Sequence, residues 1–321
     1  MVPAVDPGAV DRSVRVGVIL GIVAAVGYSL ANLALRSLSD SGAVVGDAWD
    51  IWVTAVKAMI TGCTAWVIVL IRLIRGRRSF PSLALVPSLI VAGLVMQFGG
   101  NLCFQLALGH LGLAITVPIV FACIIVVGAL AGRAMLGDPI TRDVVLAMGV
   151  MFAAIVLLSI GTMNDGPRIE SVRVSGTLIG LAIAAISGCS YGLVGVLIRH
   201  LVRSTLAVES VLIVFSTTGV LLLGGLAVSQ AGWEPIQSAS ADCWRELFTA
   251  SATNAIAFFA VSYALKVIDV NRMNVINASQ NGMCAIGAVV IFDEQLNRLA
   301  ITGIFLTIVG LLVLGRKSPV E

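Results

Sequence analysis

The stretch SFPSLALVPSLIVAGLVMQFGGNLCFQLALGHLGLAITVPIVFACIIVVGALAG, residues 79–132, decides the fold, because it contains no Asp, Glu, Lys or Arg. Its one interruption is the short segment Gly109-His110-Leu111-Gly112. A helix of about 20 apolar residues crosses the hydrocarbon core of a bilayer. The stretch therefore predicts two membrane helices joined by a tight hairpin.

Polar side chains recur inside this apolar stretch at a helical spacing. Gln97, Asn101 and Gln105 drift by only about 40° per step, so they share one helical face. Asn254 opens a similar pattern in the second half of the chain, where an asparagine-rich helix follows. Hydrogen bonding between helices, worth under about 1 kcal/mol per group, is the alternative interpretation. Because several stripes share one polar character, we interpret them as the lining of a solute path.

The composition excludes several classes of protein. Hydrophobic residues make up 59% of the chain and charged residues 12%, and the mean hydropathy is +1.05. A soluble domain carries about 25% charged residues. The six cysteines form no C-x-x-C pair and the two histidines form no cluster, so we expect no metal site, no cofactor and no enzyme. The net charge of +3 favours no nucleic-acid partner.

Charge-free runs and basic residues predict the membrane topology. With the amino terminus inside, 14 of the 20 basic residues fall in cytoplasmic segments, five fall outside, and Lys57 lies within a span. This bias predicts a multi-pass protein of the cell membrane with both termini in the cytoplasm. The spans are expected at residues 16–35, 51–71, 85–108, 113–132, 144–163, 176–198, 210–230, 247–265, 273–292 and 299–315.

The two halves of the chain share a sequence pattern. Tyr28 precedes Arg36 near the end of the first helix, and Tyr191 precedes Arg199 at the same spacing near the end of the sixth. Because five helices are an odd number, the second half enters the membrane from the opposite side, as in transporters built from inverted repeats. The expected fold is an all-α integral membrane protein with ten transmembrane helices in two inverted five-helix repeats. The expected parts are a cytoplasmic lead (1–15), a first repeat (16–163), an outward linker (164–175), a second repeat (176–315) and a cytoplasmic tail (316–321).

Lys57 is the one Lys, Arg, Asp or Glu well inside a predicted span. A charged side chain at that depth is costly unless it faces water or a partner. Two interpretations stay open: Lys57 contacts an anionic part of a substrate, or it extends outward toward Asp50.

Other side chains are candidates for the wall of a cavity. Tyr28 and Asn32 share one helical face, as do Asn254 and Phe258. Pro118 removes a backbone donor, so we interpret it as a gating kink. Glu209, Asp269, Asp138 and Glu294 lie at helix ends, where solvated caps are expected, and no acid lies in mid-membrane. The predicted substrate-binding residues are Tyr28, Asn32, Lys57, Gln97, Asn101, Gln105, Tyr191, Asn254, Phe258, Asn274, Asn277 and Asn281.

Several of these segments resemble EamA-type transporters of the drug/metabolite transporter (DMT) superfamily over about residues 16–315. The resemblance is carried by Phe104-Gln105-Leu106-Ala107-Leu108 with Pro118, by Val261-Ser262-Tyr263-Ala264-Leu265, and by the turns Leu136-Gly137-Asp138 and Phe292-Asp293-Glu294. The family usually has Glu in these turns, so Asp138 is a conservative departure.

The resemblance implies what the protein does and what it contacts. It implies an exporter or exchanger of small metabolites and does not name the substrate. The expected function is that of a secondary transporter that moves a small metabolite, such as an amino acid or related amphiphilic solute, by alternating access through a central cavity between EamA-like repeats. A membrane scaffold or lipid-translocating partner subunit is the alternative. The expected partners are a small-molecule substrate and the lipid bilayer, with the protein a monomer or homodimer.

Overall fold

The computed structural model describes residues 7–40, 47–77, 80–111, 113–163, 174–204, 206–293 and 297–315, and these residues form helices and loops without a strand. The helices of the first half are α1 (Pro7–Asp40), α2 (Asp47–Ile74), η1 (Leu83–Leu85), α3 (Val86–Leu94), η2 (Val95–Leu102), α4 (Cys103–Leu111), α5 (Leu113–Leu136) and α6 (Arg142–Met163). Those of the second half are α7 (Val174–Ser204), α8 (Val208–Ala231), α9 (Glu234–Gln237), α10 (Ala241–Ala264), α11 (Val270–Ala278), α12 (Gln280–Phe292) and α13 (Arg298–Gly315).

The long helices are apolar enough to place the protein in a membrane. Eight segments of the described chain have the length and composition of a membrane span. The runs 83–111 and 270–292 each count as one span, although each contains more than one helix. Helix α6 is not among the eight segments, and the apolar part of α13, Arg298–Val313, is shorter than these spans. The structure is therefore that of an integral membrane helical protein, while the count of ten spans stays a prediction.

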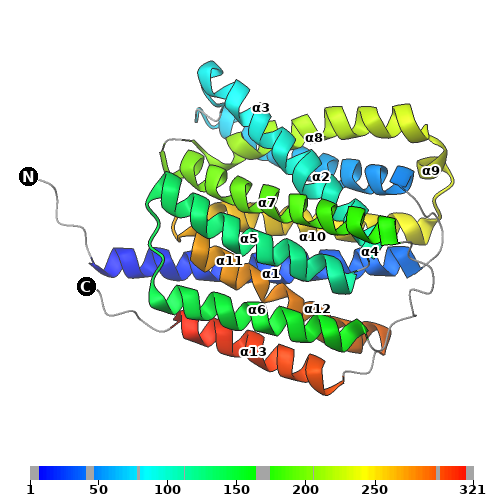
Figure 1. Ribbon diagram of the computed structural model, residues 1–321. Coiled ribbons are helices and arrows are strands. Elements are labelled where there is room, and N and C mark those ends of the chain that lie inside the picture. The colour runs from blue at the N-terminus through cyan, green and yellow to red at the C-terminus, as the bar shows by residue number, and fades with distance from the viewer. Residues whose placement is uncertain are drawn as a thin grey trace, which may run out of the picture.

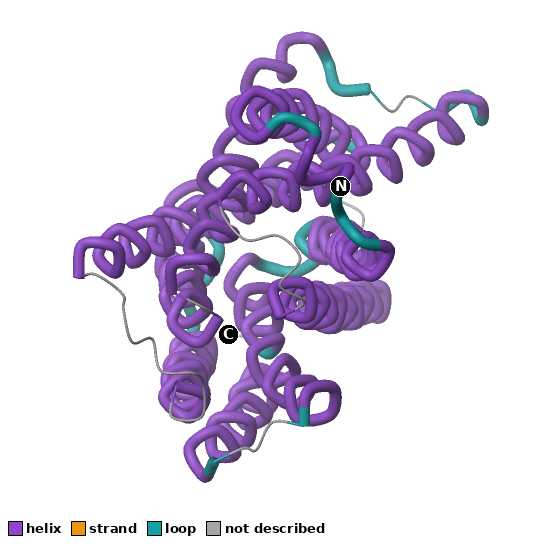
Figure 2. Tube along the Cα trace, turned by 90° about the vertical axis from the view of Figure 1, so that its right-hand side faces the viewer, coloured by secondary structure: helices purple, strands orange, loops and turns teal. Residues whose placement is uncertain are grey.

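The helices pack side by side in pairs, of which α5 with α7 is parallel and the others are antiparallel (Figure 1). Helix α1 packs along α10, α2 along α8, α5 along α7, and α6 along α13. Small residues permit this close approach in lipid: a Cβ atom added at Gly192 of α7 would lie 3.0 Å from the Ile124 carbonyl oxygen of α5. Figure 2 looks along the helices and shows them grouped around one another.

Two of the spans are not regular α-helices. The run 83–111 contains the π-helix η2, and π-helical turns occur frequently at functional sites. The run 270–292 is interrupted at Ser279, between α11 and α12. Discontinuous helices of this kind occur in membranes where they border a cavity or are buried in protein.

The bundle has two ends, which we name after an acidic residue at each. At the Asp138 end α1, α6, α8 and α11 begin and α5, α7 and α10 finish; the Asp50 end lies opposite. Helix α5 ends with Gly137 at φ 67°, a left-handed conformation that commonly terminates helices. Helix α12 ends with Asp293 in the same conformation at φ 53°. Both acidic turns named in the sequence therefore follow the same type of helix end.

Candidate functional site

A cavity of about 140 Å³ lies between the two halves of the bundle. Helices of both halves contribute polar side chains to its wall, together with aromatic rings such as Phe104 and Phe121. The predicted substrate-binding residues that line it are Tyr28, Asn32, Lys57, Gln97, Asn101, Tyr191, Asn254, Phe258, Asn274 and Asn277. The structure brings these residues to one cavity; their role in binding a substrate stays a prediction.

One wall is held by a chain of hydrogen bonds through η2. The Tyr191 hydroxyl of α7 donates to Asn101 Oδ1 at 2.7 Å, and Asn101 Nδ2 donates to Gln97 Oε1 at 2.8 Å. Gln97 Nε2 in turn donates to the Phe215 carbonyl oxygen of α8 at 3.1 Å. The chain therefore fixes two amides of the cavity wall and joins three segments of the bundle.

Another part of the wall is built on the interruption at Ser279. Gln280 begins α12 there, and its Oε1 accepts a hydrogen bond from Asn32 Nδ2 at 3.3 Å. The Ser29 hydroxyl of α1 also lies 3.2 Å from the Gln280 carbonyl oxygen. Gln280 lines the cavity, although it is not among the predicted substrate-binding residues. Its place beside three regularly spaced asparagines was the available signal.

Gln105 and Asn281 are not among the residues that line the cavity. Gln105 Nε2 donates to Asp50 Oδ1 at 3.0 Å, toward the other end of the bundle. The i→i+5 turns of η2 end at Leu102, so the rotation per residue changes before Gln105 is reached. Asn281 Nδ2 donates to the Ala278 carbonyl oxygen at 2.9 Å, across the interruption at Ser279.

Lys57 lies on the cavity wall and only 6% of it is exposed. Among the described residues its ammonium group has no hydrogen bond or ion pair, and Asp50 is bonded to Gln105 instead. The outward-extending interpretation of Lys57 is therefore not the arrangement in this structure. Pro118 lies within α5, which continues through it; its side chain is outside the described part, so the gating kink stays a prediction.

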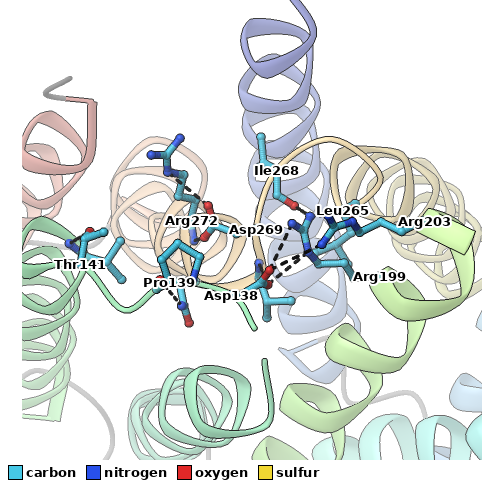
Figure 3. Close-up of polar contacts among 12 residues, drawn as sticks. Asp138, Pro139, Thr141, Arg199, Arg203, Leu265, Ile268, Asp269 and Arg272 are labelled. Carbon is cyan, nitrogen blue, oxygen red and sulfur yellow. Dashed lines mark hydrogen bonds and ion pairs between the residues drawn. The ribbon is translucent and has the colours of Figure 1, made fainter. Parts of the chain in front are cut away.

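A buried ionic cluster closes the wall near the Asp138 end (Figure 3). Asp138 is 3% exposed and pairs with Arg199, Oδ2 to Nε at 3.1 Å and Oδ1 to Nη2 at 3.3 Å. Arg199 Nη1 donates to the carbonyl oxygens of Leu265, at 2.9 Å, and of Ile268. The backbone N–H of Val270 donates to Asp138 Oδ2 at 3.3 Å. We name this set of contacts the Asp138–Arg199 staple.

The staple corrects the expectation that Asp138 is a solvated cap. A charge is buried when an opposite charge and hydrogen-bond donors compensate it, and Arg199 together with the Val270 N–H group does so here. A hollow of about 310 Å³ lies on the outer side of the staple. It also borders Asp269, whose carboxylate caps α11 by accepting from the Arg272 N–H group at 2.8 Å, as a helix cap was predicted to do.

Glu209 is a second acid for which the expectation of a solvated cap is wrong. It is 1% exposed, pairs with Arg72 and accepts a hydrogen bond from the Tyr263 hydroxyl at 3.1 Å. Glu294, the remaining acid of the expected caps, lies outside the described residues.

At the opposite end another arginine joins the two halves. The Arg36 guanidinium of α1 lies over the Phe292 ring of α12, 4.9 Å from its centroid. Arg36 is the residue that the sequence pattern aligned with Arg199. Each of the two arginines therefore contacts the acidic turn region contributed by the other half.

These features define a helical membrane protein with a polar cavity between its halves, and a family match covers most of its second half. Residues 178–316 match the EamA-like transporter family. This match bears out the resemblance inferred from the sequence for the second half of the chain, and it is consistent with the DMT superfamily of membrane transporters. No curated protein matches the chain.

Solved structures share the fold. One, described as "Crystal structure of protein", has a TM-score of 0.72 and 17% sequence identity, covering 93% of this chain and 96% of that chain. At this identity the likeness concerns the fold alone.

Proposed function

We propose that this protein is a secondary transporter, an exporter or exchanger, that moves a small metabolite such as an amino acid by alternating access. The observation that carries the proposal is the central cavity, whose polar wall is contributed by both halves of the chain. Substrate sites of secondary transporters lie at the interface between structural repeats. The family match over residues 178–316 supports the same class.

Alternating access requires contacts between the halves that break in turn. The Asp138–Arg199 staple joins the first half to the second at one end, and Arg36 stacked on Phe292 joins them at the other. These equivalent contacts at opposite ends support two inverted five-helix repeats, with α6 and α13 as the spans that complete ten. The proposed repeats are residues 16–163 and 176–315, with the linker 164–175 between them.

The proposed location is the cell membrane, with the Asp138 end and both termini in the cytoplasm. Arg72, Arg133, Arg203 and Arg272 belong to this end, and a surplus of basic residues is typical of the cytoplasmic side. A monomer or a homodimer is proposed, because the cavity is built from one chain.

A membrane scaffold is the second candidate, and the position of the polar residues argues against it. A scaffold is expected to present its polar stripes to a partner protein, whereas Asn101, Tyr191 and Gln97 bond to one another inside the bundle.

Counterflow in reconstituted vesicles tests the proposal. Purified protein is placed in vesicles loaded with unlabelled amino acids, and labelled leucine is added outside. A transporter produces transient accumulation of the label above that in protein-free vesicles. If folded protein exchanges no amino acid, nucleoside, sugar or amphiphilic drug from a wider panel, the scaffold interpretation takes its place.

A further inference from the structure

The central cavity contains a positive charge for which the described residues provide no counter-ion. Lys57 lines it and is 6% exposed, and no acidic residue is among the residues that line it. Within the described chain, three acids of the bundle have other partners: Asp50 accepts from Gln105, Glu209 pairs with Arg72, and Asp138 pairs with Arg199.

An uncompensated ammonium group in such a place favours an anion. Burial of a charge away from water is costly unless an opposite charge accompanies it. A low local dielectric also strengthens the attraction to any anion that enters the cavity. A solute that enters the cavity can therefore supply the negative charge that balances the Lys57 ammonium group.

Two further polar atoms of the cavity wall have no partner within the described residues. They are the Ser216 hydroxyl of α8 and Asn277 Oδ1 of α11. Ser216 belongs to the wall that carries Lys57, because α2 packs along α8 and a Cβ atom added at Gly62 would lie 3.2 Å from Ser216 Cβ. Asn277 comes from the interrupted span and offers only an acceptor at Oδ1. The wall thus offers a cation and a hydroxyl on one side, and a free acceptor elsewhere.

The remainder of the wall limits the size and character of the solute. A cavity of about 140 Å³ is comparable with an engineered cavity of about 150 Å³ that holds benzene. Phe104, Phe121 and Phe258 give it apolar surface. A single ammonium balances a monoanion, whereas a phosphate dianion would keep one charge uncompensated.

We propose that the cavity selects small monocarboxylates with an apolar side, whose carboxylate contacts Lys57 and Ser216; where the solute also carries an amine, the amine donates to Asn277 Oδ1. This inference rests on the proposed transport function and narrows its substrate class. The shared chemistry is the carboxylate, which an α-amino acid or a simple organic acid supplies.

Binding of a matched series to purified protein tests the inference. The probes are leucine, 4-methylpentanoate, leucinamide and 3-methylbutylamine, which share one apolar chain and differ in the carboxylate and the amine. Leucine and 4-methylpentanoate should raise the melting temperature, and the two probes without a carboxylate should not. Tighter binding of leucine than of 4-methylpentanoate identifies the amino acid as the source of the carboxylate; the reverse order identifies the simple acid.

Variants connect this selectivity to the named residues. Lys57→Met should weaken carboxylate binding at least tenfold, and Lys57→Arg should retain part of it because the charge remains. Ser216→Ala should weaken it less. Lys266→Met removes an exposed cation at the Asp138 end and is the matched control, with unchanged affinity.

Equal stabilisation by 3-methylbutylamine, no binding of either carboxylate, or full affinity in folded Lys57→Met would overturn the inference. Counterflow separates this failure from that of the proposed function. Transport of a cationic or neutral solute with no response to carboxylates keeps the transporter and removes the substrate class. Carboxylate binding that depends on Lys57 without any counterflow keeps the site and removes the transport function.

Discussion

At the scale of residues, Asn101 and Asn277 line the same cavity but differ in the hydrogen bonds that their side-chain amides make. Asn101 accepts from Tyr191 and donates to Gln97, so both ends of its amide have protein partners. Asn277 Oδ1 has no partner within the described residues. The Asn101 amide therefore contributes to stability through bonds that Asn277 Oδ1 lacks. Substitutions should distinguish an effect on stability from an effect on transport.

We expect Asn277→Leu to reduce transport at least tenfold while the melting temperature stays within a few degrees of the parent. Asn101→Leu should reduce transport similarly and also destabilise the protein by about 1 kcal/mol, because hydrogen bonds in membranes contribute about 0.6 kcal/mol each. Counterflow and thermal unfolding at matched expression measure both effects. Thr302→Val, which removes only a bond to the Arg298 carbonyl oxygen on an exposed face, is the control. Full transport in both leucine variants would remove these amides from the site.

At the scale of elements, the Asp138–Arg199 staple connects the turn after α5, the end of α10 and the start of α11. The cavity borders the staple, because Ile198 and Leu265 both line the cavity. Ile198 precedes Arg199 in the sequence, and the Leu265 carbonyl oxygen accepts a hydrogen bond from Arg199. Removing one member of a buried ion pair costs about 3–5 kcal/mol. The staple is therefore strong enough to bias which end of the cavity is closed.

We expect Asp138→Asn to increase access to the cavity from the Asp138 end. A cysteine introduced in place of Met273, a cavity residue of α11, should react with a thiol reagent more than tenfold faster when Asp138→Asn is added. Asp242→Asn, which removes an exposed acid paired with Arg245 on α10, should leave the rate unchanged. An unchanged rate in Asp138→Asn, with a lowered melting temperature, would assign the staple to stability alone.

At the scale of the whole molecule, the membrane orientation decides which end faces the cytoplasm. The loop after α2 and the segment of α9 lie at opposite ends of the bundle. Arg75 and Ser238 are exposed there, so both positions suit chemical labelling.

We expect a membrane-impermeant maleimide to label Ser238→Cys but not Arg75→Cys in intact cells. Disruption of the membrane should make both positions reactive, and the unsubstituted protein measures the background from the six native cysteines. Labelling of Arg75→Cys from outside would reverse the orientation and the assignment of the Asp138 end to the cytoplasm.

The sequence alone determined the helical membrane class and much of the cavity wall. Charge-free runs bounded the helices because a bilayer excludes charge, and the four-residue spacing of Gln97 and Asn101 placed both on one face. Tyr28 and Tyr191 were found through the same helical periodicity. These are local properties, since each depends on residues within a single helix.

Only the tertiary structure decided which polar groups have partners. Asp138 and Glu209 looked like solvated caps because their partners, Arg199 and Arg72, are far away in the sequence. Gln105 leaves the polar face that Gln97 and Asn101 share because the π-helix η2 precedes it. No single residue in the sequence indicates that π-helix. The sequence left two interpretations of Lys57 open, and the packing of α2 places Lys57 on the wall of the cavity. A buried charge is compensated by an opposite charge or hydrogen-bonding group a few ångströms away. Which group lies that close depends on how the whole chain folds, because the partners are distant in the sequence.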